Sequence, residues 1–140
     1  MFVQLVSALG LTVALVHACD CIDVGAKQSK RGADIVFRET VAALRDSAEG
    51  DCAVVFRVDR VWKGEVTETF EMLWLESDYA CFGFPSGMLK VGNELLVYGS
   101  TFGSRTVQRY PYLSMPCATK LAKLATDIAQ LGRGHKPKAR

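Results

Sequence analysis

The sequence predicts a small all-β domain of about five strands with one helix near its C-terminal end. Between residues 34 and 110, several runs alternate apolar and polar side chains with a period of two, which is typical of half-buried strands. After Pro116 the apolar period lengthens to that of an amphipathic helix. The 140 residues also match the usual size of one domain. We therefore expect a single, mostly β domain.

The first three predicted strands lie in the first half of this domain. A β-branched and aromatic run covers residues 34–44. Turn residues separate it from runs over residues 54–62 and 66–74, which we predict to form a hairpin. In that hairpin Arg57 and Glu71 face solvent, because they alternate with apolar neighbours. The side chains expected inside are Val54, Phe56, Val58, Phe70, Met72 and Trp74.

The remaining segments give weaker patterns. Residues 21–32 are polar and indicate a loop or one short helical turn. Residues 75–91 lose all periodicity and indicate a long loop, of the kind that often carries function. Two further strands are expected over residues 94–101 and, more briefly, over residues 105–110.

The C-terminal segment predicts one helix that packs on the sheet. Its apolar stripe ends at Gly132, the residue type expected just past a helix. Lys123 and Asp127 are one turn apart, so they are expected to pair on the outer face. The stripe consists of Leu121, Leu124, Ala125, Ile128 and Leu131.

Residues 1–18 are predicted to be a secretory signal peptide. They contain no charged side chain, are apolar in the middle and end in a small residue, Ala18. The apolar run is shorter than the roughly 20 residues that a membrane-spanning helix needs, which argues against an anchor. Lipoprotein processing at Cys19 is the alternative, although His17 occupies a place where that processing favours a small residue. We therefore expect a secreted, extracellular or periplasmic protein, with a lipid-anchored form as the alternative.

Charge gives little indication of a partner. The chain has 17 basic and 15 acidic residues, and four of the basic ones lie in residues 133–140. That segment also contains Gly134 and Pro137 and is predicted to be a disordered tail. The rest of the domain carries a small negative charge, so we expect no nucleic-acid partner.

Five cysteines occur in the chain. Because a signal peptide is predicted to precede them, they are expected to form disulfides rather than a zinc site. Zinc spacing would repeat a close pair, whereas only the first two are close. Four cysteines can form two bridges, and one is left over. They are Cys19, Cys21, Cys52, Cys81 and Cys117.

The domain offers no evident catalytic machinery. Its two histidines, His17 and His135, lie in the predicted leader and tail, so a serine or cysteine nucleophile has no imidazole base. Carboxylate pairs on strands are usually solvated faces. We therefore expect neither an enzyme nor a bound cofactor or metal.

Cleavage after Ala18 would make Cys19 the N-terminal residue. Its α-amine and its own carbonyl oxygen would then lie side by side as a bidentate chelate for a metal. Bridges from Cys19 and Cys21 to distant cysteines would hold this end rigid, where most chain ends fray.

These features together resemble the netrin-like module of the tissue inhibitors of metalloproteinases, over nearly the whole mature chain. The leader ends directly before Cys19-Asp20-Cys21, and Cys81 and Cys117 follow at the expected places. Three longer motifs support the likeness: Ala33-Asp34-Ile35-Val36-Phe37-Arg38, Val58-Asp59-Arg60-Val61-Trp62-Lys63-Gly64, and Val91-Gly92-Asn93-Glu94-Leu95-Leu96-Val97-Tyr98. Because it has one module only, the chain resembles the single-module, bacterial relatives.

The resemblance implies a five-stranded barrel of the OB type over residues 19–132, with a flanking C-terminal helix. It also implies the bridges Cys19–Cys81 and Cys21–Cys117, which leave Cys52 as a free thiol. The implied activity is inhibition of a secreted zinc metalloprotease by a monomer whose Cys19 chelates the catalytic zinc. The residues implied to contact the protease are Asp20, Cys21, Asp78, Tyr79, Ala80 and Cys81.

Two departures from the family pattern favour keeping a second class of function open. Asp20 stands where family inhibitors of animal matrix proteases have a small hydroxyl residue, and its carboxylate would repel a catalytic glutamate. Arg31 replaces the third cysteine of the animal module. The alternative is a secreted or lipid-anchored protein-binding module that does not inhibit, with membrane contact only if Cys19 is lipidated.

Overall fold

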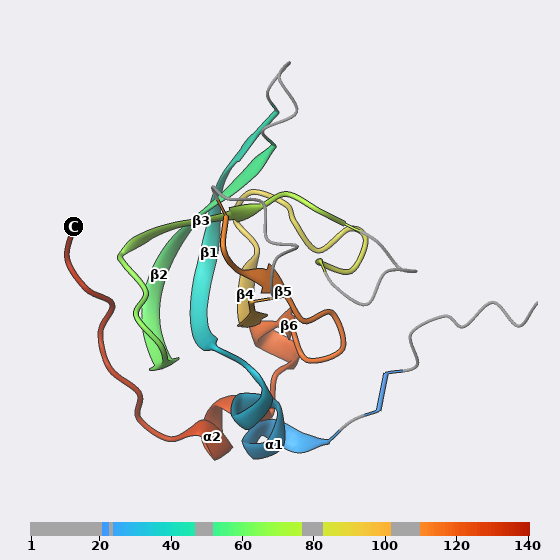
Figure 1. The fold of residues 1–140 in the computed structure, drawn as a ribbon, viewed down its shortest axis with the longest axis vertical. Helices are drawn as coiled ribbons and strands as arrows, with labels where there is room; N and C mark the ends of the chain where they lie inside the picture. The colour runs from blue at the N-terminus through green and yellow to red at the C-terminus, as the bar shows by residue number, and fades with distance from the viewer. Residues whose placement is uncertain (1–20, 23, 47–51, 77–82, 102–109) are drawn as a thin grey trace, which may run out of the picture.

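The computed structural model describes residues 21–22, 24–46, 52–76, 83–101 and 110–140. These residues form a six-stranded antiparallel sheet and two short α-helices (Figure 1). The strands are β1 (Ile35–Arg45), β2 (Ala53–Lys63), β3 (Thr69–Leu73), β4 (Glu94–Ser100), β5 (Leu113–Ser114) and β6 (Lys120–Leu121). The helices are α1 (Gly25–Gly32), the 3₁₀ helix η2 (Ala122–Leu124) and α2 (Asp127–Leu131).

The sheet has the order β3-β2-β1-β4-β5, and β6 also pairs with β4. The predicted hairpin is confirmed, because β2 pairs with β3 in a register that places Phe56 opposite Phe70. Val54, Phe56 and Val58 are buried, whereas Arg57 is exposed. The period of two therefore identified the inner face of β2 correctly.

β3 is less buried than the alternation predicts. Met72 is buried, but Phe70 and Trp74 are only half-buried and pack against the edge of the core. Glu71 on the opposite face is also half-buried and forms an ion pair with Arg45 of β1. An edge strand has a neighbour on only one side, so its inward side chains are covered less completely.

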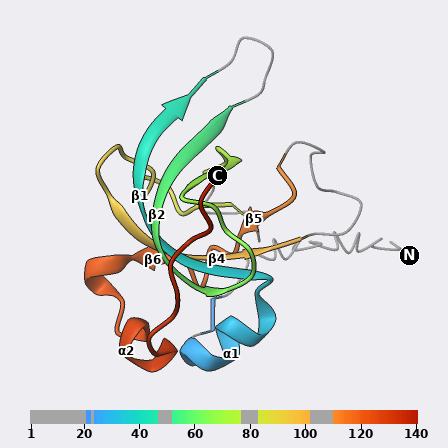
Figure 2. The ribbon, with the colours of Figure 1, turned by 90° about the vertical axis from the view of Figure 1, so that its left-hand side faces the viewer.

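β1 is the central strand and bends as it runs between β2 and β4 (Figure 2). Its pairing with β2 shifts register at three points, between Val36 and Phe37, Arg38 and Glu39, and Val41 and Ala43. Such irregularities increase local twist and let a sheet curve around a core. At the far end of β2, Gly64 (φ 79°) allows a close approach, because a Cβ there would lie 2.6 Å from Ile35 Cγ2.

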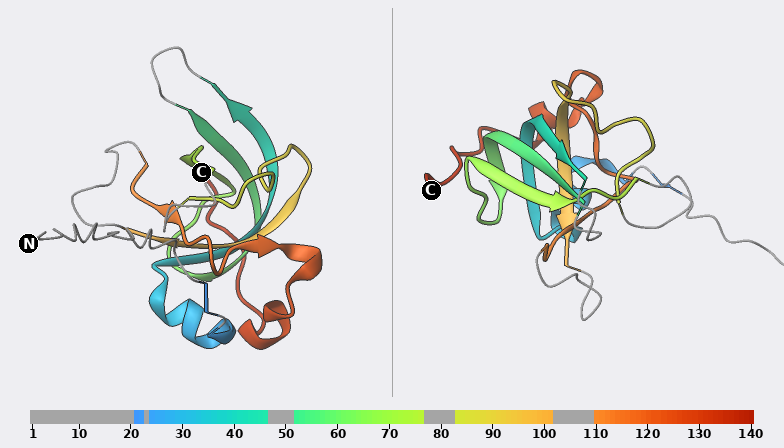
Figure 3. Two further views of the ribbon diagram at one scale, coloured as in Figure 1. Left: turned by 90° about the vertical axis from the view of Figure 1, so that its right-hand side faces the viewer. Right: turned by 90° about the horizontal axis from the view of Figure 1, so that it is seen from above.

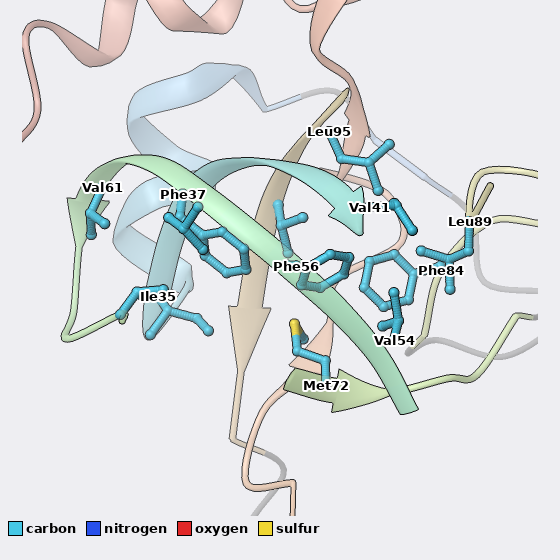
Figure 4. Close-up of a cluster of buried hydrophobic side chains, with 13 residues drawn as sticks. Ile35, Phe37, Val41, Val54, Phe56, Val61, Met72, Phe84, Leu89 and Leu95 are labelled. Atoms are coloured by element: carbon cyan, nitrogen blue, oxygen red, sulfur yellow. The ribbon is translucent and has the colours of Figure 1, made fainter. Parts of the chain in front are cut away.

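The curved sheet wraps around the main hydrophobic core (Figure 4). Three phenylalanines contact one another in turn across it with inclined rings, whose centroids are 6.0 Å apart for Phe37 and Phe56 and 5.8 Å apart for Phe56 and Phe84. Phe84 and Leu89 enter this core from the segment that precedes β4. Side chains from the strands and from the segment that precedes β4 thus pack in the same core.

A second, smaller core lies on the opposite face of β1 and β4. Its buried members are Ala33, Val36, Trp62, Leu96, Tyr98 and Ala118. Ile128 and Leu131 of α2 pack against it, so the helices cover this face of the sheet at one end of the molecule (Figure 3). The expected docking of the C-terminal segment on the sheet is therefore confirmed.

The predicted closed barrel is not what the described residues form. β3 and β5 are the two ends of the sheet and do not pair with each other there. β5 has only two residues, and both of them pair with β4. Between β3 and β5 there is instead a contact of two side chains, Phe70 and Tyr112, whose ring centroids are 6.1 Å apart. The predicted strand over residues 105–110 falls almost wholly outside the described residues.

Two helices differ from their predictions. α1 has eight residues and therefore exceeds the single turn expected from the polar segment. The single helix expected over residues 121–131 is divided, because Ala125 has an extended backbone (ψ 109°) between η2 and α2. Asp127 does not lie on an outer face with Lys123. It is 7% exposed and is bound from within by Tyr98 and Lys120, which draws the chain inward at this point.

Residues 133–140, expected to be a disordered tail, lie along β2 and the turn that follows it (Figure 1). His135 exchanges two backbone hydrogen bonds with Val61, both 2.8 Å. Lys138 donates its N–H to Val66 O and accepts from Glu68 N–H, and its ammonium pairs with Glu65. Composition alone missed this because the free edge of β2 supplies hydrogen-bonding groups that the tail satisfies.

Candidate functional site

The candidate site is centred on the disulfide between Cys21 and Cys117. Their Cα atoms are 5.0 Å apart although 96 positions separate them in sequence. Both residues are exposed. The bridge fixes the start of the described chain, just before α1, to a turn that follows β5. This is one of the two bridges that the resemblance implied.

A buried hydroxyl network holds the turn that carries Cys117. Thr119 accepts a hydrogen bond from the backbone N–H of Tyr98 (3.1 Å), and its hydroxyl lies 2.9 Å from that of Ser114. Ser114 and Thr119 are 1% and 4% exposed, so these bonds are shielded from water. Met115 N–H also donates to Tyr98 O (2.8 Å). The turn is therefore fixed to β4, the interior strand beside it.

The segment that follows Cys81 reaches the same place. Gly83 N–H donates to Ser114 O (2.8 Å), and Phe84 N–H donates to Leu75 O (2.7 Å). A side-chain contact adds to this, since Glu76 accepts from Leu89 N–H (3.2 Å). Both ends of the connection over residues 77–82 are thus held together beside β5.

Most of the predicted contact residues lie outside the described part of the chain. These are Cys19, Asp20, Asp78, Tyr79, Ala80 and Cys81, and with them the expected Cys19–Cys81 bridge. Cys21 is described and bridged, and Cys52 is an unbridged thiol. Cys52 is half-buried directly before β2, 3.2 Å from Asp46 Oδ1. The start of β2 lies at the opposite end of the molecule from α1 (Figure 1).

Sequence reasoning missed a buried carboxyl group, Glu39. Its side chain is 1% exposed, and among the described residues neither carboxyl oxygen has a hydrogen-bond partner. It faces the main core, because it lies opposite Val58 of β2 and Leu95 of β4, which both belong to that core. Burial, assisted by the negative charges of Asp59 and Glu94, raises the pKa of Glu39 to about 9. The carboxyl group is therefore neutral at physiological pH.

A second buried polar cluster joins the sheet to α2. Tyr98 donates its hydroxyl proton to Asp127 Oδ2 (2.7 Å), and Lys120 Nζ lies 3.0 Å from the same oxygen. Burial, and then the bond to Asp127, raises the pKa of Tyr98 well above its usual value. The phenol therefore stays protonated and acts as a donor that positions α2.

The described residues contain few other candidate features. A pocket of about 230 Å³ is lined by Gly92, Asn93, Glu94, Leu121 and Lys123, none of which was predicted as a site residue. No group of three or more potential metal ligands occurs among the described residues. Within the same residues, no helix is long and apolar enough to cross a membrane. No protein-family model matches the chain, and a search of curated proteins finds no match.

Proposed function

We propose that the processed chain is a secreted inhibitor of zinc metalloproteases, in which the α-amine and carbonyl oxygen of Cys19 chelate the catalytic zinc. The observation that carries this proposal is the Cys21–Cys117 disulfide at the start of the domain. It fixes an exposed segment two residues after the proposed N-terminus. A rigid amine can enter another protein's site without the entropy cost of ordering a free chain end.

The arrangement around Ser114 supports the second proposed bridge. Gly83 is hydrogen-bonded to Ser114, and Cys117 lies three positions farther along the same segment. Cys81 precedes Gly83 by two residues, just as Cys19 precedes Cys21 by two. The chain beside each member of the proposed Cys19–Cys81 pair therefore approaches the first bridge. Two adjacent bridges would clamp Cys19 from both sides.

The chemistry needs no covalent step. A catalytic zinc keeps one position for the water that attacks the substrate. A neutral amine nitrogen in that position displaces the water, and the adjacent carbonyl oxygen completes a chelate. Because an α-amine becomes protonated below about pH 8, inhibition should weaken as the pH falls through that value. Asp20 would enter the specificity pocket, which favours a protease whose pocket is basic or polar.

The test compares three forms of the protein against a panel of secreted zinc proteases. The native form, starting at Cys19, is expected to inhibit at least one of them. A form with one alanine added before Cys19, and a form acetylated at Cys19, are expected to lose inhibition while their unfolding curves stay unchanged. Intact-mass measurement of the secreted protein gives the identity of the first residue.

Two outcomes would replace this function with the non-inhibitory binding module. One is equal inhibition by the native and extended forms. The other is that no form inhibits and that the intact mass shows a lipid attached to Cys19. Asp20→Ser serves as the matched variant for specificity, because it restores the small hydroxyl residue while leaving the amine in place.

A further inference from the structure

α1 presents an exposed face that carries only positive charge. Lys27, Lys30 and Arg31 are three and four positions apart, so they lie on one side of the helix. Lys27 and Arg31 are exposed and Lys30 is half-buried, while Ala26 on the other side is buried. No acidic residue occurs in the helix. Among the described residues, none of these three side chains has a hydrogen-bonded or ionic partner.

A fourth cation strengthens this face from the sheet. Lys63, the last residue of β2, donates its ammonium protons to Lys30 O (2.8 Å) and Arg31 O (3.3 Å). These carbonyls are at the negative end of the helix, where a cation is favourable. Two acidic residues flank the helix in sequence, Asp23 and Asp34. Asp34 accepts from Thr101 N–H (2.7 Å) and from Ser100 Oγ (3.2 Å), and these bonds, together with the charge of Lys63, lower its pKa. Asp23 lies outside the described residues and subtracts one charge from the four cations, which leaves the segment net positive.

Two exposed apolar side chains precede the basic face. Ile22 and Val24 are 75% and 43% exposed, and they are two of the four large exposed hydrophobic residues in the described chain. Val24 directly precedes α1 and falls on the same stripe as Lys27 and Arg31. Ile22 follows bridged Cys21, so the disulfide keeps this apolar pair at the end of the helix.

We propose that this surface, defined by Ile22, Val24, Lys27, Lys30 and Arg31, binds the anionic face of a phospholipid bilayer. Basic side chains would contact the lipid phosphates while the two apolar side chains enter the headgroup region. A bilayer uses both kinds of side chain, because surface binding combines electrostatic attraction with buried apolar area. A sulfated polysaccharide would use the charges alone. The inference holds whether or not the chain inhibits a protease, and it needs no lipid on Cys19.

The test measures co-sedimentation with vesicles of phosphatidylcholine mixed with phosphatidylglycerol, against vesicles of phosphatidylcholine alone. The wild-type protein is expected to bind the mixed vesicles and to be released by salt, which screens surface charge. Replacing Lys27, Lys30 and Arg31 by glutamine should weaken binding about a hundredfold, since each basic residue near the surface contributes roughly fivefold. Glutamine keeps the helix propensity, so the fold is retained.

The matched control replaces three exposed basic residues elsewhere, Arg57, Lys90 and Arg140, by glutamine. It changes the net charge equally and should retain most of the binding. A third variant, Ile22→Ser with Val24→Ser, should bind mixed vesicles several-fold more weakly. All variants share one N-terminus, so any lipid or leader affects them equally.

Three results would overturn the proposal. Equal binding of the wild type to neutral and mixed vesicles would indicate an anchor rather than this surface. Equal loss in the control would indicate net charge alone. Binding to immobilised heparin but to neither vesicle, lost in the glutamine variant of α1, would identify a sulfated polysaccharide as the partner.

Discussion

Burial of the Glu39 carboxyl group at the centre of the sheet is energetically unfavourable. A carboxyl group without partners loses its hydration when the chain folds, and an ionised one would lose far more. The protein avoids the larger cost by keeping the group protonated, as its raised pKa of about 9 implies. In the unfolded chain the pKa of the same carboxyl group is near its ordinary value of 4.5. Folding therefore becomes coupled to proton binding at this one residue.

The first prediction follows from the sign of that coupling. A raised carboxyl pKa gives a contribution that is fully favourable below about 4.5 and is lost as the pH rises toward about 9. Between these values the free energy of unfolding should fall by about 1.4 kcal/mol per pH unit on account of Glu39. Glu39→Gln cannot ionise, so it should remove this slope and be more stable than the wild type at neutral and alkaline pH.

Urea unfolding at a series of pH values measures this difference. The two proteins should be most alike near pH 4 and diverge as the pH rises. Glu68→Gln is the control, because it removes an exposed carboxylate that is not among the groups raising the pKa of Glu39. Parallel curves for wild type and Glu39→Gln across the whole range would show that Glu39 is ionised in the folded protein.

Single residues differed in how far the sequence could predict them. The odd count left one cysteine over, and the resemblance identified it as Cys52, which the structure confirms as an unbridged thiol. Glu39 gave a weak signal, because it alternates with Phe37 and Val41 and so falls on the inner face of its strand. Charged residues at such positions usually indicate a change of face, so the pattern alone could not identify a buried carboxyl.

At the scale of elements, local pattern predicted strands well and the C-terminal helix poorly. The hairpin of β2 and β3 has turn chemistry and alternating burial that agree with each other, so its register could be predicted. The segment over residues 121–131 has a helical period, yet the structure divides it. Asp127 forms tertiary bonds with Tyr98 and Lys120, and these outweigh propensity in so short a segment.

The C-terminal tail gives the second prediction, which concerns Gly134. Its φ is 64°, and a Cβ would lie 2.7 Å from Val61 O. Gly134→Ala should therefore detach the tail from β2 and lower the free energy of unfolding by about 1–2 kcal/mol, the cost of a left-handed backbone for a residue with a Cβ. Hydrogen exchange at the Val61 and Glu68 amides should accelerate, because both donate to tail carbonyls.

Lys136→Ala is the matched control, since this side chain is exposed and its removal leaves the backbone pairing intact. Unchanged exchange at Val61 in Gly134→Ala would contradict the pairing of tail and strand. A change in Gly134→Ala alone would confirm that the tail protects the edge of β2.

At the scale of the whole molecule, the sheet separates two cores, and the helices cover only the smaller one. The sequence predicted an all-β domain with a covering helix because the periods of strands and helices are visible within short segments. It could not predict the open edge between β3 and β5, since that depends on how many residues of β5 pair with β4. It also could not indicate that three basic residues share one face of α1, because the polar segment over residues 21–32 predicted at most one helical turn and the structure has eight helical residues there.

The last prediction concerns the disulfide between Cys21 and Cys117, which links the segment before α1 to the turn after β5. Replacing both Cys21 and Cys117 by serine removes a loop closure over 96 positions, which the chain-entropy model values at about 4 to 5 kcal/mol. That is a large part of the stability of a typical small domain, so the double variant should unfold at much lower urea concentration. Both residues are exposed, and serine in their place therefore leaves no cavity.

Cys52→Ser provides the control, because serine keeps a donor for Asp46 and no bridge is lost. It should change the free energy of unfolding by less than about 1 kcal/mol. If the bridge also positions Cys19, the double variant should lose protease inhibition even at temperatures where it remains folded, while Cys52→Ser retains it. Full inhibition by the folded double variant would show that the Cys21–Cys117 bridge is not needed to hold the chelating amine.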